Sequence, residues 1–153
     1  MKNKTAKDVM KTDVIIANRE DIIVDVAKLL IKEKIGGMPV VDDNNKVVGI
    51  ISETDILKKE KYIEPPKIIN ILEGLLFLDD LKQMEQDMKR IAAYKVKDIM
   101  STEIVKVYED DIFDDVANVM IKKSINRVPV VDATNTLKGI ICRYDIIRAM
   151  YNE

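Results

Sequence analysis

The feature that most constrains this chain is an internal repeat. Residues 7–57 align with residues 97–147 without a gap, at a constant offset of 90, and 22 of the 51 paired positions are identical. The identities include Gly49 with Gly139 and Asp55 with Asp145. A repeat of this length indicates one structural unit built twice, in which each copy can cover an apolar surface of the other.

Each copy predicts the same order of elements. In the first copy, the β-branched run at 14–16 predicts a short strand, and a helix follows from Asp21 until Gly36 and Gly37 end it. Two more β-branched runs, at 40–41 and 47–51, flank a hairpin turn, and a second helix starts near Ser52. The unit is β-α-β-β-α. The predicted fold class is α/β (α+β), with two units packed face to face about a pseudo-two-fold axis.

Two segments of each copy resemble the signature segments of cystathionine-β-synthase (CBS) domains. They read Met-Pro-Val-Val-Asp … Gly-Ile-Ile-Ser-Glu-Thr-Asp in the first copy and Val-Pro-Val-Val-Asp … Gly-Ile-Ile-Cys-Arg-Tyr-Asp in the second. The opening Lys-Asp-Val-Met and Lys-Asp-Ile-Met are similar to the family's usual start of the first strand. The resemblance implies a tandem CBS pair, or Bateman module, with repeats at 1–61 and 97–153 and a helical linker at 62–96.

The linker carries apolar residues at three- and four-residue intervals from Ile68 to Ile91. This pattern predicts an amphipathic helix, or two helices that meet near Gly74. The apolar stripe either covers the module's own edge or docks on a second subunit or a regulated protein partner. We expect a homodimer, as formed by members of the family that the chain resembles.

The composition favours a binding module over an enzyme. The chain has no histidine and a single cysteine, Cys142, so it lacks the usual neutral-pH general base, a zinc cluster and an internal disulfide. A net charge of −2 provides no field that would attract nucleic acid or an anionic membrane. No apolar run is long enough for a membrane helix, and the lone cysteine fits a reducing compartment, so we expect a cytoplasmic protein.

The candidate site is the corner where the last strand of a copy meets its last helix. In the first copy, the hydroxyls of Ser52 and Thr54 can donate to a phosphate, and Asp55 can accept from both hydroxyls of a ribose. Ser52 and Asp55 also form a capping-box pattern, which would satisfy the first amides of the helix without any ligand. The family resemblance implies the ligand role, in which Asp55 binds the ribose of an adenosine ligand.

The resemblance also implies that each corner faces the first loop of the other repeat. Cys142 and Tyr144 replace Ser52 and Thr54 in the second copy, so we expect two inequivalent sites, with arginines supplying charge in the second. The implied ligand-binding residues are Asp55, Ser52, Thr54, Ser101, Thr102, Ile104 and Val105 at the first site, and Asp145, Tyr144, Arg143, Arg127, Thr12, Val14 and Ile15 at the second.

The implied function is regulatory sensing of an adenine nucleotide. AMP, ADP or ATP is the expected ligand class, and S-adenosylmethionine is a further candidate. We expect no catalytic residue, no metal site and no required cofactor. The alternative is a ligand-free scaffold, in which the domain pair and its linker only dimerise or hold another protein. Thermal stabilisation by nucleotides separates the two, because only a ligand that binds the folded state raises its stability.

Overall fold

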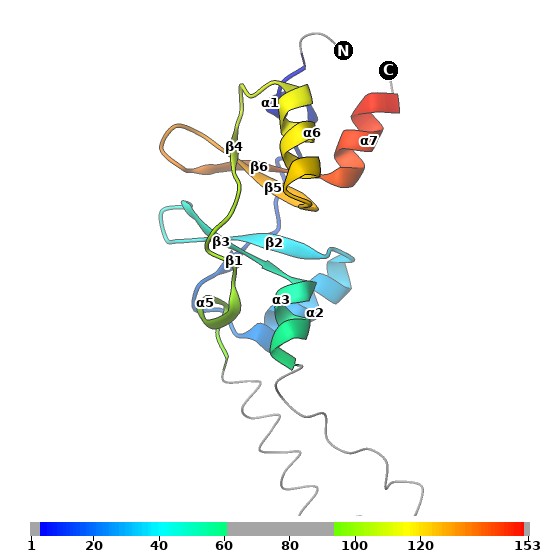
Figure 1. The fold of residues 1–153 in the computed structure, drawn as a ribbon. Coiled ribbons are helices and arrows are strands. Elements are labelled where there is room, and N and C mark those ends of the chain that lie inside the picture. Colours follow the sequence, from blue (N-terminus) through cyan, green and yellow to red (C-terminus); the bar gives the residue numbers. More distant parts are fainter. Residues whose placement is uncertain (1–3, 61–93, 152–153) are drawn as a thin grey trace, which may run out of the picture.

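The computed structural model describes residues 4–60 and 94–151, which form two halves stacked on one another (Figure 1). The helix predicted between Ile68 and Ile91 lies outside these residues. Each half holds a three-stranded sheet, in the orders β1-β2-β3 and β4-β5-β6. In both sheets the first strand runs parallel to the second and the second antiparallel to the third.

The two repeats fold alike, and the predicted β-α-β-β-α order and mixed α/β class are confirmed. The elements of the first repeat are β1 (Ala17–Asn18), α2 (Ile23–Glu33), β2 (Gly37–Val41), β3 (Val47–Ser52) and α3 (Glu53–Glu60). Those of the second repeat are β4 (Val107–Tyr108), α6 (Phe113–Lys122), β5 (Arg127–Val131), β6 (Leu137–Cys142) and α7 (Arg143–Tyr151).

A short helix precedes each repeat and packs in the opposite half. Helix α1 (Ala6–Val9) lies with the second repeat, and α5 (Val96–Ile99) lies with the first (Figure 1). The buried side chains agree, because Ala6 packs in a cluster with Phe113, whereas Val96 packs in a cluster with Ile23. Each half therefore combines one repeat with the short helix that precedes the other repeat, and neither repeat closes its core alone.

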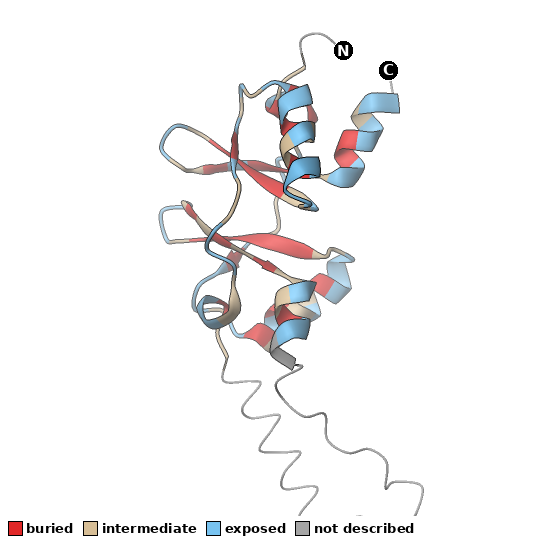
Figure 2. Cartoon of the chain, viewed as in Figure 1, coloured by how far each residue is buried: buried red, intermediate tan, exposed pale blue. Residues whose placement is uncertain are grey.

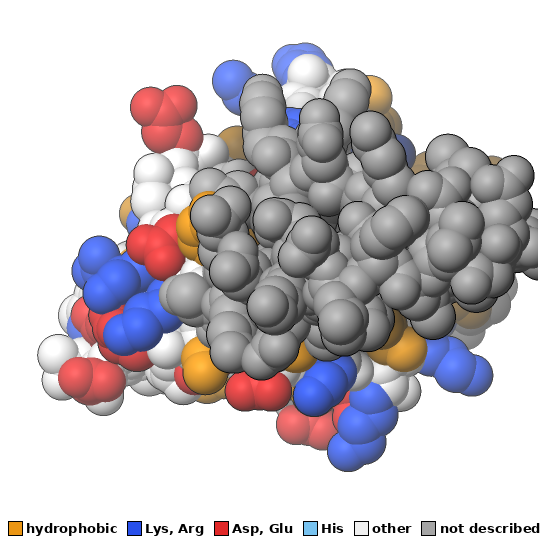
Figure 3. All heavy atoms as spheres, turned by 90° about the horizontal axis from the view of Figure 1, so that it is seen from below, with side chains coloured by type: hydrophobic (Ala, Val, Ile, Leu, Met, Phe, Trp, Pro, Cys, Tyr) orange, Lys and Arg blue, Asp and Glu red, His pale blue; other side chains and the backbone are white. Residues whose placement is uncertain are grey.

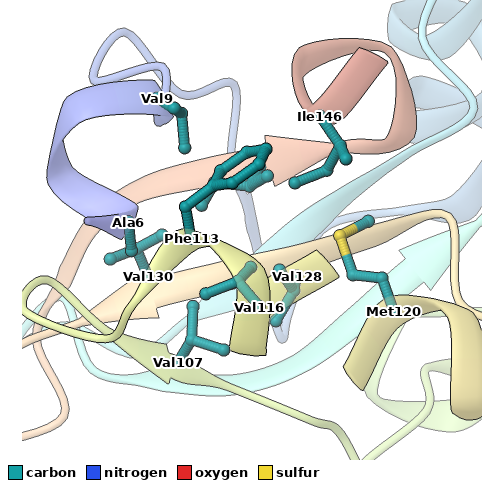
Figure 4. Packing of buried hydrophobic residues seen from close by; sticks show 10 residues of the cluster. Ala6, Val9, Val107, Phe113, Val116, Met120, Val128, Val130 and Ile146 are labelled. Atoms are coloured by element: carbon teal, nitrogen blue, oxygen red, sulfur yellow. The ribbon is translucent and has the colours of Figure 1, made fainter. Parts of the chain in front are cut away.

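The core consists of apolar side chains on the strands and on the inner faces of the helices (Figure 2). Figure 4 shows Phe113 at the centre of the second-repeat cluster, between Val9 on α1 and Ile146 on α7. A third cluster joins the two sheets near their hairpin turns, and its buried members are Val41, Val47, Val131 and Leu137. The apolar side chains of the strands therefore pack against helices on one face of each sheet and against the other sheet on the opposite face.

Three local predictions for the first repeat are wrong. The first strand is Ala17–Asn18 and not residues 14–16, because Val14 packs against the cluster that joins the two sheets and Ile15 packs against the core of the first half. Helix α2 begins at Ile23 and not at Asp21, since the Asp21 carboxylate accepts the amide of Asn18 at 2.7 Å. The helix ends at Lys34, which is left-handed at φ 53°, so the glycine pair does not provide its C-terminal turn.

Basic and acidic side chains are intermingled on the described margin of the face in Figure 3. Lys95 and Lys97, for example, both bond the carboxylate of Glu20, each at 2.6 Å. Within residues 4–60 and 94–151, the search for a helix long and apolar enough to span a membrane found none.

Candidate functional site

The two repeats meet through reciprocal backbone hydrogen bonds beside each corner. The amide of Ile50 donates to the carbonyl of Ser101 at 3.0 Å, and the amide of Ser101 donates back to Ile50 at 2.9 Å. Ile140 and Lys11 exchange the same two bonds in the other repeat, both at 2.9 Å. These bonds bring the loop that follows α5 to the first corner, and the loop that follows α1 to the second, as the sequence predicted.

Glycine makes this approach of two backbones possible. A Cβ on Gly49 would stand 2.8 Å from the carbonyl oxygen of Ser101, and one on Gly139 would stand 2.8 Å from that of Lys11. Real Cβ atoms do not approach a backbone oxygen that closely, so any side chain here would push the repeats apart. The glycine in each Gly-Ile-Ile segment is therefore needed for repeat-to-repeat contact.

The first corner, residues 52–55, forms the predicted capping box. The Asp55 carboxylate accepts from the amide and from the hydroxyl of Ser52, both at 2.8 Å, and the Asp55 amide donates to the Ser52 hydroxyl at 3.3 Å. The other carboxylate oxygen of Asp55 accepts from the Ser101 hydroxyl at 3.2 Å. Asp55 is partly exposed. Because each carboxylate oxygen can accept two bonds, Oδ1 can still bind a further donor.

This corner lines a cavity of about 260 Å³, which we call the Asp55 cavity. Of the seven residues predicted for the first site, six line it, and only Thr102 is not among them. The residues that sequence reasoning proposed for this site and the structure brings together are Ser52, Thr54, Asp55, Ser101, Ile104 and Val105.

The cavity has further walls that the sequence analysis did not assign. The loop after α6 supplies one wall, and two glutamates flank the predicted residues on the other sides. These additional lining residues are Gly36, Ile50, Glu53, Glu103, Ser124, Ile125 and Asn126. The repeat alignment gives no direct signal for the loop at 124–126, because its contribution depends on how the second sheet lies across the first.

Arg127, which the resemblance groups with Asp145, also lines the Asp55 cavity, and in the pairing of β5 with β6 it lies opposite Cys142 of the second corner. Its guanidinium lies against the glycine pair of the first repeat. A Cβ on Gly36 would stand 2.7 Å from Nη2 of Arg127, and one on Gly37 would stand 2.3 Å from Nη1. The two glycines therefore leave the space that this arginine occupies, and they place it beside the first corner.

The second corner, residues 142–145, holds its carboxylate differently. Asp145 is 1% exposed and accepts the amide of Cys142 at 2.9 Å. Its Oδ1 has no hydrogen bond of good geometry among the described residues, but the ammonium of Lys11 lies 3.3 Å away and the guanidinium of Arg148 3.8 Å away. Lys11 occupies the repeat position of Ser101, so a cation takes the place of a hydroxyl.

Within the described ranges, the other residues predicted for the second site make no hydrogen bond or ion pair with this carboxylate. Tyr144 is 68% exposed, and the side chain of Arg143 donates to the carbonyl of Ile125 at 3.1 Å. Asp145 lines a cavity of about 250 Å³ beside α1 and α7, and none of the predicted partners Thr12, Val14 and Ile15 lines it. The residues that do line it are Lys4, Asp8, Val9, Asp145, Arg148 and Ala149.

The single cysteine, Cys142, lies at the second corner. Burial raises the pKa of its thiol, the negative charge of Asp145 raises it further, and Arg127 and Lys11 oppose the shift. The raised pKa keeps the group a neutral thiol near pH 7, which disfavours a nucleophilic role. No group of three or more acidic, cysteine or histidine side chains suited to a metal ion occurs within the described ranges.

Comparison with known sequences gives close relatives of the whole chain. The protein MJ1426 of Methanocaldococcus jannaschii is 34% identical over 151 residues, which cover 94% of this chain and 89% of that protein. The L-aspartate semialdehyde sulfurtransferase of the same organism is 32% identical over 142 residues, and these cover 93% of this chain but only 22% of that protein. The chain thus resembles both a protein of its own size and one module of a longer enzyme.

Solved structures share the fold over nearly the whole chain. CBSX2 of Arabidopsis thaliana, in complex with AMP, has a TM-score of 0.73 and 25% identity, and the match covers 97% of this chain and 96% of that chain. The CBS domain pair of MJ0100, in complex with 5′-methylthioadenosine and S-adenosyl-L-methionine, has a TM-score of 0.68 and 28% identity, with 97% and 96% covered. The CBS domain family itself matches residues 6–62 and 96–152. With both repeats matched, this chain belongs to the CBS domain family as a tandem pair.

Proposed function

We propose that the chain is a regulatory module that binds an adenosine ligand in the Asp55 cavity. The observation that carries the proposal is the convergence of three segments on this cavity, namely residues 52–55, 101–105 and 124–127. They supply a carboxylate with free acceptor capacity for a ribose, hydroxyl and amide donors, and apolar side chains for a base. The complexes of CBSX2 with AMP and of MJ0100 with two adenosine ligands support the ligand class.

The ligand acts by being bound and not by being converted. Its binding free energy would favour one arrangement of the two halves over another, and a protein partner would respond to that shift in population. The single cysteine fits a reducing compartment, and we propose that the module works in the cytoplasm.

Calorimetry with a panel of adenosine, AMP, ADP, ATP, 5′-methylthioadenosine and S-adenosylmethionine tests this function. We expect heat of binding from at least one ligand and an unchanged ligand when the mixture is analysed by chromatography. A ligand at 100 times its Kd should also stabilise the fold by about 2.7 kcal/mol. If no adenosine ligand binds, the ligand-free scaffold remains, and if a ligand is consumed, the module is an enzyme.

The homodimer is part of the same proposal. Helices α2, α3, α6 and α7 lie on the side of the molecule away from the hairpin turns in Figure 1, and their exposed large apolar side chains include four at equivalent positions of the two repeats. They form two pairs at the repeat offset, Ile31 with Ile121 and Leu57 with Ile147. A face with this internal symmetry suits a second copy of itself. Light scattering should give twice the monomer mass of 17.5 kDa, and Ile31→Glu with Ile121→Glu should give the monomer.

A further inference from the structure

The charged side chains that line the Asp55 cavity are mostly acidic. Among the described lining residues, Glu53, Asp55 and Glu103 carry carboxylates, whereas Arg127 alone carries a positive charge. Asp55 accepts bonds within its helix cap and from Ser101, and its Oδ1 can accept one more. Glu53 and Glu103 line the same cavity in which we propose that the ligand binds.

Arg127 is not free to act as an isolated cation. The position of a Cβ on Gly36 lies 2.7 Å from Nη2 of Arg127 and 3.3 Å from Oε1 of Glu53, so the two charged groups flank one point. The carboxylate therefore offsets part of the guanidinium's charge in the cavity. Arg127 is thus the one basic residue against three carboxylates among the described lining residues.

This balance of charge bears on the part of the ligand that extends from the ribose. A phosphate monoester is close to a dianion at neutral pH, and three carboxylates would repel it. An uncharged thioether meets no such penalty, and a sulfonium cation is attracted. Resting on the function proposed above, we infer that the Asp55 cavity selects adenosine ligands whose 5′ substituent is uncharged or positive, namely a 5′-thioether or sulfonium, over 5′-phosphates.

The structure of the MJ0100 domain pair is consistent with this ligand class, since its two ligands are a thioether and a sulfonium of adenosine. The inference for this chain rests on its own side chains, however, because a fold that accommodates adenosine is compatible with either kind of 5′ group. AMP, ADP or ATP is the ligand class expected from the sequence, in which nothing assigns Glu53 and Glu103 to the site, whereas both line the cavity in the structure.

The test compares three ligands that share adenosine and differ in 5′ charge: AMP, 5′-methylthioadenosine and S-adenosylmethionine. Calorimetry on the full chain should give a Kd for S-adenosylmethionine at least about tenfold below that for AMP, with the thioether between them. The gap should narrow at high salt, because the glutamates are exposed and their field is screened.

Two variants test whether the glutamates of the cavity cause the preference for S-adenosylmethionine over AMP. Glu53→Gln combined with Glu103→Gln should reduce the preference for S-adenosylmethionine over AMP by about tenfold and leave the thioether's Kd within about threefold. Asp43→Asn removes one exposed carboxylate from the hairpin turn, at the opposite end of strands β2 and β3, and should change none of the three affinities. If AMP binds tightest, or if the three bind equally, the selectivity is wrong while the adenosine site stands. If none of the three binds, the proposed function fails with it.

Discussion

The two corners of the molecule share a backbone and differ in the neighbour of one carboxylate. Asp55 is partly exposed, faces the hydroxyl of Ser101 and lines the Asp55 cavity. Asp145 is buried and faces the ammonium of Lys11 at 3.3 Å. Ser101 and Lys11 are the same position in the two repeats, so a hydroxyl lies beside Asp55 where a half-exposed ammonium lies beside Asp145. A residue kept in both copies therefore need not keep one role.

The largest expected difference between the corners is in ligand affinity. Asp55→Ala removes the carboxylate that we propose accepts from the ribose, and the loss of a hydrogen bond to a charged group costs about 1.5–3 kcal/mol, roughly a ten- to hundredfold rise in Kd. Asp145→Ala should leave the Kd nearly unchanged. Calorimetry with the tightest-binding adenosine ligand measures both.

Asp55 also caps α3, so the melting temperature of each variant without ligand must be measured in parallel. If Asp55→Ala lowers that temperature but leaves the affinity intact, the carboxylate is only a cap and the site assignment is wrong.

The loss of folding stability should be larger at the second corner than at the first, the opposite of the order expected for ligand affinity. Asp145→Ala leaves the Cys142 amide and the Lys11 ammonium without their buried acceptor, and we expect a loss of about 1.5–3 kcal/mol. Asp55→Ala removes a more exposed cap and should cost about 1 kcal/mol. Thermal unfolding measures the difference. Equal losses would mean that burial and the ion pair add nothing at the second corner.

The sequence could predict the shared parts of this comparison. The offset of 90 identified two equivalent units, and the Ser-x-x-Asp spacing identified the capping box that Ser52 and Asp55 form. Both follow from local chemistry, since a cap depends on residues three apart. The same offset could have identified Lys11 as the counterpart of Ser101, and so the ion pair at Asp145.

The placement of Arg127 could not be predicted from the alignment. Its repeat position is that of Gly37, and its side chain crosses to the glycine pair because only a residue without a Cβ leaves that space. The strand predicted at 14–16 failed for a related reason. Val14 and Ile15 have strand-like side chains, but Val14 packs against the cluster that joins the two sheets and Ile15 against the core of the first half, and neither belongs to a strand.

Gly49 and Gly139, which precede the two corners, should lose similar amounts of folding stability when substituted, because both lie at the same kind of contact between the repeats. Gly49→Ala and Gly139→Ala each force a Cβ to within 2.8 Å of a backbone oxygen on the other repeat. We expect each to cost about 1–3 kcal/mol and to lower the melting temperature by several degrees. Gly36→Ala is the matched control, because its Cβ meets side-chain ends of Arg127 and Glu53, which can move. A mild effect at Gly49 or Gly139 would indicate that the repeats separate easily.

The smallest expected difference between the repeats is in folding stability as a function of pH, and it arises at the turns that precede α2 and α6. Hydrogen bonds from Lys95 and Lys97 lower the pKa of Glu20 from 4.5 to about 2. A carboxyl whose pKa is lower in the folded state stabilises the fold above the unfolded pKa, and that contribution is lost as the pH falls from about 4.5 toward 2. The second repeat has Asp110 at the position of Glu20 and Thr5 at that of Lys95, and no ion pair of Asp110 occurs within the described ranges.

Glu20→Gln should therefore destabilise the protein slightly at pH 6, and the gap to the wild type should close as the pH falls to 2. For Asp110→Asn, the free energy of unfolding should change with pH as it does in the wild type, because this variant removes a carboxylate that has no such pair. Denaturant unfolding at a series of pH values measures the gap, and the difference between variants isolates Glu20 from other carboxyls with lowered pKa, such as those of Asp8 and Asp132. High salt should reduce the gap at pH 6, since the three side chains are exposed enough to be screened. If the two variants give the same profile, the lysines contribute nothing, and the two turns are equivalent in energy as well as in shape.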